Sequence, residues 1–540
     1  MAFASRIKRL ASETAIYGLS SVLGRLLNYI LVPFYTWYFS PDEYGVVIAL
    51  YAAFVFLNIL YTYGMEAAYM KYASGKEGRR RVSETFSTAA WTLLLSSSLF
   101  SFLLIVFREP LADVIGLDGP WVHLIYYAAA ILWLDTMAVL PFAELRLSGR
   151  PWRFASTRLA GITANVLLNI LFIAGWHMGI EAILLANILS SATTLVLLLP
   201  VYGKYLKPLF HKPLWKELLR FGWPFLPSGI GYALTEMVSR FYLVHMPKER
   251  VLALYGSWID AEKLAAKAAE AAERVRQAAE QAGTLHMPET ARMIAEAADR
   301  VYGAYVVGVF GTMYKLGVFM MLFSQMFRFA WQPFFLQHAE DTDAKELFAR
   351  VFTLFTAVGL FIWLGVSFWA DDLVSIPLPR VGYLIEPSYW PGLFIVPLIL
   401  LAYLFQGWYY NFSAGLYIKK QTRYFVHNTL AGGLVTLVLN MWLVPSYGML
   451  AAAWATLLAY ATMAMGLFIT ARRFYPIAYE WRNIGLMGAW AGMLFFLWKQ
   501  TTFLQTFWVE GLLLITFLAG LFLLRVLPYE VLLRWYSRSS

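Results

Sequence analysis

The chain of 540 residues contains no cysteine, so disulfide bonds, thiolate nucleophiles and thiolate metal sites are excluded. It is also poor in charge, because Asp, Glu, Lys and Arg make up only 14% of its residues, against about 25% in soluble proteins. Its histidines are scattered without the spacing of metal ligands, and it has no GxSxG, HExxH or phosphate-loop sequence. We therefore expect neither a soluble protein nor an enzyme, and we expect no metal and no cofactor.

Hydrophobic residues, in contrast, make up 60% of the chain and gather in long runs. A run of about 20 apolar residues is long enough to span a bilayer as a helix. Hydropathy therefore predicts an all-α, polytopic membrane protein with about 14 transmembrane helices. The predicted spans are residues 15–38, 44–64, 84–107, 121–142, 154–176, 180–201, 221–244, 303–329, 349–370, 390–413, 424–444, 449–471, 483–498 and 507–526.

The positive charges predict the orientation of these spans, since cytoplasmic loops of membrane proteins are rich in Lys and Arg. Alternate short loops carry clusters such as the arginines at 79–81, whereas the short loops between them carry only Arg108, Arg380 and Lys499. We expect both termini in the cytoplasm and an uncleaved signal anchor at the basic N-terminus. The net charge of +10 then reflects the inner loops, and no nucleic-acid partner is expected.

One segment, residues 257–303, departs from this hydrophobic pattern. It is rich in Ala, Glu, Lys and Arg, which favour helices, and Gly283 and Pro288 divide it into two helices. The second helix is expected to run into the span at 303–329. This outer hairpin is either an arm that touches a partner or covers a cavity mouth, or a solvated hairpin without chemistry. We favour the second interpretation, because the helices show charges but no aromatic or polar cluster.

Two pairs of spans resemble each other. The fifth and sixth spans, like the eleventh and twelfth, begin with Leu-Ala-Gly and carry Leu-Asn in mid-helix, at Asn169 and Asn440. Gly179 and Gly448 also match. We interpret spans 1–6 and 7–12 as two copies of one six-helix unit.

A weaker similarity relates the segment Tyr44–Tyr51 (YGVVIALY) to the segment Val307–Tyr314 (VGVFGTMY). Since six is an even number, both copies have the same orientation, and parallel repeats are typical of transporters with a site at the bilayer midplane. Two further helices follow the second copy. The predicted domains are an N-terminal lobe (1–220), a C-terminal lobe (221–256 and 304–480), the helical-hairpin insertion (257–303) and two extra helices with a cytoplasmic tail (481–540).

A few charged residues lie inside the predicted spans, where a charge facing lipid costs at least a few kcal/mol. Such residues usually face a cavity or a partner. Unpaired cations in a cavity attract anions, and pyrophosphate fits a guanidinium fork well. The predicted substrate-binding residues are Arg25, Lys315, Arg240 and Arg158.

The two acids in these spans, Asp135 and Glu236, are predicted to serve in ion coupling or in charge pairing. Glu236 lies four residues before Arg240, so the two share a helix face and can neutralise each other. Asp135 fits either a proton or sodium coupling role or a salt bridge to Arg25 or Arg158. Arg25 has the same alternative, a pairing with Asp135 or Glu236.

Three further groups of polar residues carry weaker signals. The charges of Glu66, Glu144 and Arg328, at inner ends of spans, are expected to reach the membrane interface. The Asp341–Asp343 sequence (DTD) is similar to the metal-nucleotide sites of glycosyltransferases, but an acidic solvated loop is the simpler interpretation. The stretch Phe405–Phe412 (FQGWYYNF) suits stacking on sugars, and it equally suits packing or an interfacial belt.

Three stretches resemble the polysaccharide biosynthesis flippases, the Wzx-like branch of the multidrug/oligosaccharidyl-lipid/polysaccharide (MOP) exporter superfamily. They are LVPFYTWYFSPDEYG (31–45), the eighth-span segment 307–335, and 419–460, which holds Asn440 and Gly448. The resemblance covers spans 1–12. Two departures are Ser239, where many relatives have Asp, and the long helical hairpin.

The resemblance implies two six-helix lobes in a V with a cationic central cavity that opens by alternating access. The implied function is flipping of a polyprenyl-pyrophosphate-linked oligosaccharide from the inner to the outer leaflet of the bacterial cytoplasmic (inner) membrane, for cell-surface polysaccharide synthesis. The implied partners are this lipid-linked substrate, membrane lipids and other membrane proteins of polysaccharide assembly. The alternatives are a drug or metabolite exporter of the same superfamily and, with less support, a polysaccharide polymerase or ligase.

Overall fold

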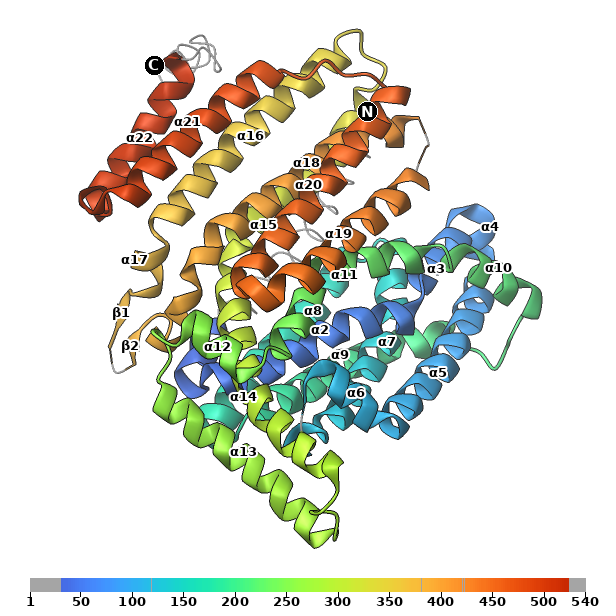
Figure 1. The fold of residues 1–540 in the computed structure, drawn as a ribbon. Helices are drawn as coiled ribbons and strands as arrows, with labels where there is room; N and C mark the ends of the chain where they lie inside the picture. The colour runs from blue at the N-terminus through green and yellow to red at the C-terminus, as the bar shows by residue number, and fades with distance from the viewer. Residues whose placement is uncertain (1–30, 118, 380, 420, 422, 524–540) are drawn as a thin grey trace. The chain divides into compact units, whose positions relative to one another are not determined.

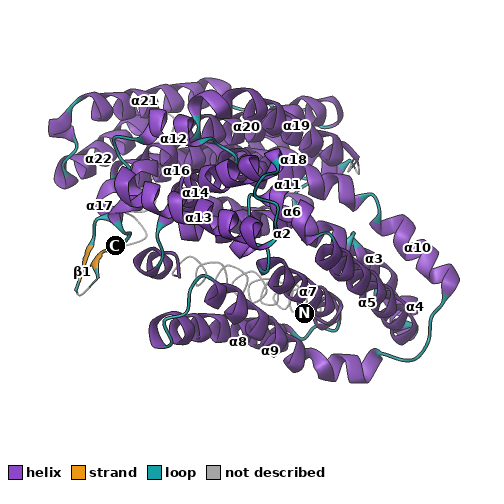
Figure 2. Ribbon diagram, turned by 60° about the horizontal axis from the view of Figure 1, so that its bottom comes forward, coloured by secondary structure: helices purple, strands orange, loops and turns teal. Residues whose placement is uncertain are grey.

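The computed structural model describes residues 31–117, 119–379, 381–419, 421 and 423–523. In this part of the chain nearly every element is a helix. The exception is a small antiparallel pair of strands, β1 (Pro377–Leu378) and β2 (Gly382–Tyr383), drawn in orange in Figure 2. The prediction of an all-α fold is confirmed.

Ten helical segments of the described residues are long and apolar enough to cross a membrane. Every predicted span after the first falls on helical residues of the described chain. Three of these helices, α11 (Phe225–Val244), α21 (Trp481–Gln500) and the shorter α22 (Phe507–Leu523), are not among those ten. The first predicted span lies mostly outside the described residues. Its described part, residues 31–38, is helical. The chain is therefore a multi-pass membrane protein, as predicted.

The chain divides into two compact units. Unit 1 comprises residues 1–312 and 436–452, and unit 2 comprises residues 313–435 and 453–540. The segment 221–256, which the repeat assigns to the second lobe, lies in unit 1.

Unit 1 contains the helices drawn from blue to yellow-green in Figure 1. They are α2 (Pro41–Thr62), α3 (Met65–Ala73), α4 (Gly75–Arg80), α5 (Val82–Val106), α6 (Arg108–Ile115), η1 (Gly119–Trp121), α7 (Leu124–Leu147), α8 (Pro151–Asn169), η2 (Ile170–Gly175), α9 (Glu181–Tyr205), α10 (Lys212–Gly222), α11 (Phe225–Val244), α12 (Lys248–Tyr255), α13 (Ala261–Gln281) and most of α14 (Pro288–Tyr314).

Unit 2 contains most of the remaining helices. They are η3 (Lys315–Gly317), α15 (Val318–Gln337), α16 (Ala344–Phe368), α17 (Ala370–Val374), η4 (Pro387–Ile395), α18 (Val396–Ile418), α21 (Trp481–Gln500), η5 (Thr502–Leu504) and α22 (Phe507–Leu523), with the larger parts of α19 (Arg423–Tyr447) and α20 (Met449–Phe474). Helices α15, α16 and α18 pack on one another.

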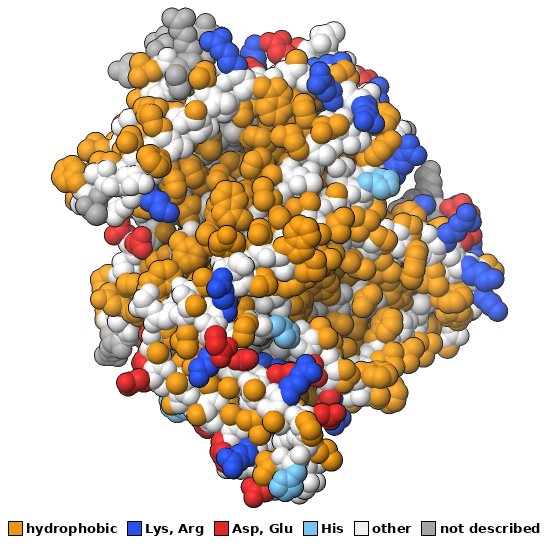
Figure 3. Space-filling view, viewed as in Figure 1, with side chains coloured by type: hydrophobic (Ala, Val, Ile, Leu, Met, Phe, Trp, Pro, Cys, Tyr) orange, Lys and Arg blue, Asp and Glu red, His pale blue; other side chains and the backbone are white. Residues whose placement is uncertain are grey.

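The core of unit 1 forms where α3, α5, α7 and α9 pack together. Met65, Phe86, Leu140 and Leu198 contribute one fully buried side chain from each of these helices. Large apolar side chains on the outer faces, such as Phe102, are exposed. Hydrophobic side chains dominate the region of α5 and α9 in Figure 3, as expected for helices that face lipid.

Helices α2 and α14 approach so closely that their backbones touch. A Cβ atom added to Gly45 would lie 1.8 Å from the carbonyl oxygen of Ala304, and one added to Gly308 would lie 1.8 Å from that of Pro41. Gly45 and Gly308 are corresponding positions of the two similar segments. The two segments therefore meet at equivalent glycines inside unit 1.

The insertion at 257–303 forms the predicted hairpin. Helix α13 ends at Gln281, Gly283 takes a left-handed conformation with φ of +69°, and α14 begins at Pro288. Helix α14 then continues without a break into the predicted eighth span, as expected. Charged side chains gather over this hairpin at the bottom of Figure 3.

Candidate functional site

Asp135 lies on α7 in a polar cluster within the membrane-spanning part of unit 1. The hydroxyl of Ser191 on α9 donates a hydrogen bond of 2.6 Å to Asp135 Oδ1. Arg158 on α8 is close enough for its positive charge to act on this carboxyl, and its guanidinium lies 5.6 Å from the centre of the Phe142 ring. The structure thus brings together the predicted residues Asp135 and Arg158.

Two amide–tyrosine pairs extend the polar interior of this unit. The amide of Asn187 on α9 donates a hydrogen bond of 2.9 Å to the hydroxyl of Tyr51, which interacts electrostatically with Asp135. The hydroxyl of Tyr35 donates to the side-chain oxygen of the fully buried Asn169 at 3.0 Å. We did not predict these groups as a cluster, although Asn residues inside apolar spans were a usable signal.

Glu236 and Arg240 both lie on α11 and are both 5% exposed. The guanidinium of Arg240 donates a hydrogen bond to the main-chain carbonyl oxygen of Glu236, and it lies 5.6 Å from the centre of the Phe310 ring on α14. Arg240 is therefore buried between its own helix and α14. Its predicted role in binding substrate stays a prediction.

The remaining predicted cations lie elsewhere. Lys315 lies half-buried in η3, the short 3₁₀ turn that separates α14 from α15 in unit 2. The neighbouring Gly317 packs against Ile399 and Tyr403 of α18. Arg25 lies outside the described residues, so a common cavity of Arg25 and Lys315 stays a prediction.

The expectation that Glu144 reaches the membrane interface is wrong. Glu144 is 1% exposed, and Arg79 binds both of its oxygens at 2.6 and 2.7 Å while the hydroxyl of Tyr69 donates to it at 2.7 Å. A buried carboxylate needs such partners, because an unpaired charge in an apolar interior is very costly. Nearby, Arg146 pairs with Glu66.

The aromatic stretch Phe405–Phe412 on α18 serves largely in packing. Phe412 is 1% exposed, and its ring centre lies 4.9 Å from that of Phe352. Gln406 is also buried and donates a hydrogen bond of 2.9 Å to the hydroxyl of Tyr460. Within the described residues, no three His, Asp or Glu side chains come together as a metal site.

Comparison with known proteins identifies the fold. Residues 10–260 match the family model described as polysaccharide biosynthesis protein. A structure of the lipid II flippase MurJ, in an inward closed conformation, matches with a TM-score of 0.68 and 12% identity, over 96% of this chain and 99% of that one. The chain has the fold of the MOP superfamily. The resemblance that the sequence indicated is confirmed.

Two further structures of the superfamily agree with this assignment. An inward-facing multidrug resistance transporter of the MATE family matches with a TM-score of 0.53 and 14% identity, over 85% of this chain and 97% of that one. A MOP superfamily transporter from Pyrococcus furiosus matches with a TM-score of 0.51 and 14% identity, over 85% of this chain and 95% of that one. A comparison with curated protein sequences gives no match.

Proposed function

We propose that the protein is a flippase that moves a polyprenyl-pyrophosphate-linked oligosaccharide from the inner to the outer leaflet of the bacterial cytoplasmic membrane, for cell-surface polysaccharide synthesis. The observation that carries the proposal is the match of residues 10–260 to the polysaccharide biosynthesis family model. The MOP fold supports it, since the MurJ structure that matches over nearly the whole chain is that of a lipid II flippase.

Membrane-embedded charges supply the chemistry for such a substrate. Cationic side chains attract a pyrophosphate, and guanidinium groups bind it with two parallel hydrogen bonds. Arg25 and Lys315 are the candidates for this capture, with Arg158 and Arg240 as further cations at membrane depth. Polar and aromatic side chains would hold the sugars while the polyprenyl tail stays in lipid.

Alternating access would then carry the headgroup across. A membrane potential, protons or sodium ions would bias the cycle, provided that they bind one conformation better than the other. Asp135 is the candidate for such coupling, because it is an acid at membrane depth next to Ser191 and within reach of the charge of Arg158.

The test is flipping of a fluorescent polyprenyl-pyrophosphate oligosaccharide by the purified full chain in proteoliposomes. We expect transport by the wild type, a loss of at least about tenfold, equivalent to about 1.4 kcal/mol, in Arg25→Ala and Lys315→Ala, and no loss in Arg292→Ala. Arg292 is a matched control because its side chain is 81% exposed on the hairpin.

Unchanged transport by Arg25→Ala would overturn the proposed role of this cation. No transport by the wild type, with several glycans and an imposed potential, would overturn the flippase proposal. The second candidate is drug or metabolite export, which the similarity to the MATE transporter fold favours. It predicts efflux of cationic dyes from the same vesicles.

A further inference from the structure

The helical hairpin of α13 and α14 is tied to the rest of unit 1 by partly buried charges. The ammonium of Lys267 on α13 donates to the hydroxyl of Ser40 at 2.6 Å and to the carboxylates of Asp42 at 2.9 Å and Glu43 at 3.3 Å. Burial disfavours the ammonium, but these carboxylates outweigh that effect and raise the pKa of Lys267 above its ordinary value. Lys267 therefore stays charged at neutral pH and fixes α13 to the start of α2.

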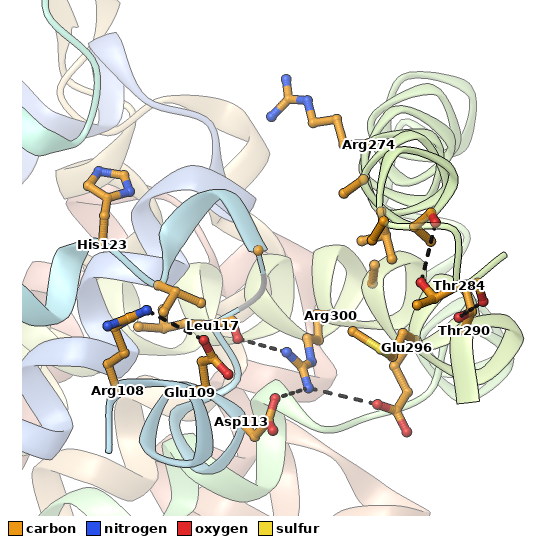
Figure 4. A pocket seen from close by; sticks show the side chains of 18 of the residues that line it. Arg108, Glu109, Asp113, Leu117, His123, Arg274, Thr284, Thr290, Glu296 and Arg300 are labelled. Atoms are coloured by element: carbon orange, nitrogen blue, oxygen red, sulfur yellow. Dashed lines mark hydrogen bonds and ion pairs between the residues drawn. The ribbon is translucent and has the colours of Figure 1, made fainter. Parts of the chain in front are cut away.

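A second anchor fixes α14. Arg300, whose side chain is 16% exposed, donates to the main-chain oxygen of Leu117 at 2.7 Å and to Asp113 Oδ1 at 2.9 Å. Both partners belong to the short segment that consists of α6 and the residues directly after it, and Figure 4 shows both beside Arg300. The hairpin is therefore not a freely solvated arm, because each of its helices is tied to another part of unit 1.

Between the hairpin and this segment lies a cavity of about 830 Å³. Small-molecule sites have volumes of about 300–1,000 Å³, so this cavity has room for a ligand of several rings. Figure 4 shows Arg108, Glu109 and His123 on one side, with Arg274, Thr284 and Thr290 on the hairpin side. The hairpin thus forms one wall of the cavity, and α6 with the start of α7 forms the opposite wall.

The charges in the cavity wall are balanced. Arg108 lies 3.6 Å from Glu109, and Arg300 binds Asp113 and lies 3.8 Å from Glu296. Such a wall offers hydrogen-bond donors and acceptors in equal measure, without the excess of one sign that would concentrate a free anion or cation. It therefore suits an uncharged ligand that both donates and accepts hydrogen bonds.

The rest of the wall is apolar or weakly polar. On the hairpin side it consists of small and flexible residues, and the ring of Tyr126 lines the opposite side. The apolar residues on the hairpin are Val275, Ala278, Ala279, Ala282, Met293 and Ala297. A sugar has the matching properties, because its hydroxyls need paired donors and acceptors while its C–H faces pack on apolar groups and aromatic rings.

We propose that this cavity binds an uncharged saccharide portion of the transported glycan on the outer side of the membrane. The inference rests on the proposed function, which supplies the glycan as the source of the saccharide. The distribution of Lys and Arg among the loops predicts that the cavity lies on the outer side. The cavity would hold sugars that have crossed, and a bound saccharide cannot return until it dissociates.

The test measures equilibrium binding rather than transport. The full chain in nanodiscs is titrated with a panel of uncharged tri- to hexasaccharides of hexoses and N-acetylhexosamines, followed by ligand-observed NMR. The first variant, Ala278→Trp, places a large ring in the cavity from an exposed position of α13. The matched control is Ala269→Trp, another exposed alanine of α13 that does not line the cavity.

We expect saturable binding of at least one saccharide by the wild type and by Ala269→Trp, and binding weakened at least tenfold in Ala278→Trp. Arg274→Ala, which removes a hydrogen-bond donor without filling the cavity, should weaken binding by a smaller factor. Equal binding by Ala278→Trp and wild type would overturn the proposal, and so would the absence of saturable binding to every saccharide at millimolar concentration.

Inorganic pyrophosphate is the comparison ligand. Stronger binding of pyrophosphate than of any saccharide, abolished in Ala278→Trp, would also overturn the proposal, because it would show an anion site. The flippase proposal is judged separately, since the binding measurement needs no transport. If the protein binds the saccharide but does not flip the lipid-linked substrate, the saccharide site stands and the flippase proposal is overturned.

Discussion

At the scale of single residues, three charged side chains of unit 1 contact partners on other helices. Asp135 accepts from Ser191, Arg240 lies against Phe310, and Glu144 binds Arg79 and Tyr69. The charged residues themselves were visible in the sequence, because each interrupts an apolar run. Their pairing was not, because the rotation of each helix decides which side chains meet, and the sequence does not report that rotation.

Glu144 gives the clearest prediction at this scale. Glu144→Ala should lower the free energy of unfolding by about 1.5–3 kcal/mol, because it removes charge-assisted hydrogen bonds and leaves the buried Tyr69 hydroxyl without an acceptor. The loss should appear as a lower thermal unfolding midpoint of the purified protein. The double variant Glu144→Ala, Arg79→Ala should lose little more than the single variant, since the two side chains act as one unit.

Glu84 provides the matched control. It pairs with Arg81 three residues away, and the Arg81 side chain is 53% exposed. Glu84→Ala should cost no more than about 1 kcal/mol, because water reaches the Arg81 guanidinium and ion pairs in contact with water contribute little. If both glutamate variants lowered the unfolding midpoint equally, burial would not explain the contribution of the Glu144–Arg79 pair to stability.

At the scale of helices, the crossing of α2 and α14 depends on the absence of side chains at Gly45 and Gly308. Gly45→Ala should destabilise unit 1 by more than about 3 kcal/mol, because its Cβ would lie 1.8 Å from the Ala304 carbonyl oxygen and only a separation of the helices can relieve the clash. Gly308→Ala should do the same. The measurement is thermal unfolding together with the yield of monodisperse protein in detergent.

Gly203 on α9 is the control for this pair. An added Cβ there has no neighbour within 4 Å, so Gly203→Ala should be neutral or stabilise the protein by up to about 1 kcal/mol through its higher helix propensity. Comparable losses in Gly203→Ala and Gly45→Ala would mean that the close crossing does not determine the stability of unit 1.

Most of the helices could be predicted from the sequence, and their grouping could not. Apolar runs fixed the spans, and Gly283 with Pro288 fixed the two helices of the hairpin, because these signals are local. The repeat assigned 221–256 to the second lobe, whereas α11 and α12 lie in unit 1 with most of α14. That grouping depends on contacts between distant segments, such as Gly45 with Ala304, which hydropathy does not report.

The docking of the hairpin was missed for a similar reason. Lys267 and Arg300 look like ordinary solvated charges of an Ala-rich helix, and only the structure places Asp42 and Asp113 beside them. The interpretation as a hairpin without chemistry rested on the hairpin alone. One side of the cavity wall comes from residues 108–126, which no pattern in the hairpin could indicate.

At the scale of the whole molecule, the uneven distribution of Lys and Arg predicts one orientation in the membrane, with the hairpin outside and the loop between α15 and α16 inside. The absence of cysteine makes this directly measurable, because any thiol introduced into the chain is the only one present. Glu280 on the hairpin and Thr342 in the loop are both exposed, so Glu280→Cys and Thr342→Cys place a reactive group at each predicted side.

A membrane-impermeant maleimide added to intact spheroplasts should label Glu280→Cys fully and Thr342→Cys only after the membrane is permeabilised. The cysteine-free wild type supplies the background for both. Labelling of Thr342→Cys in intact cells would reverse the orientation, and it would move the saccharide cavity to the cytoplasmic side. There it could only receive the glycan before transport, so this experiment decides whether the cavity acts at the start or at the end of the proposed cycle.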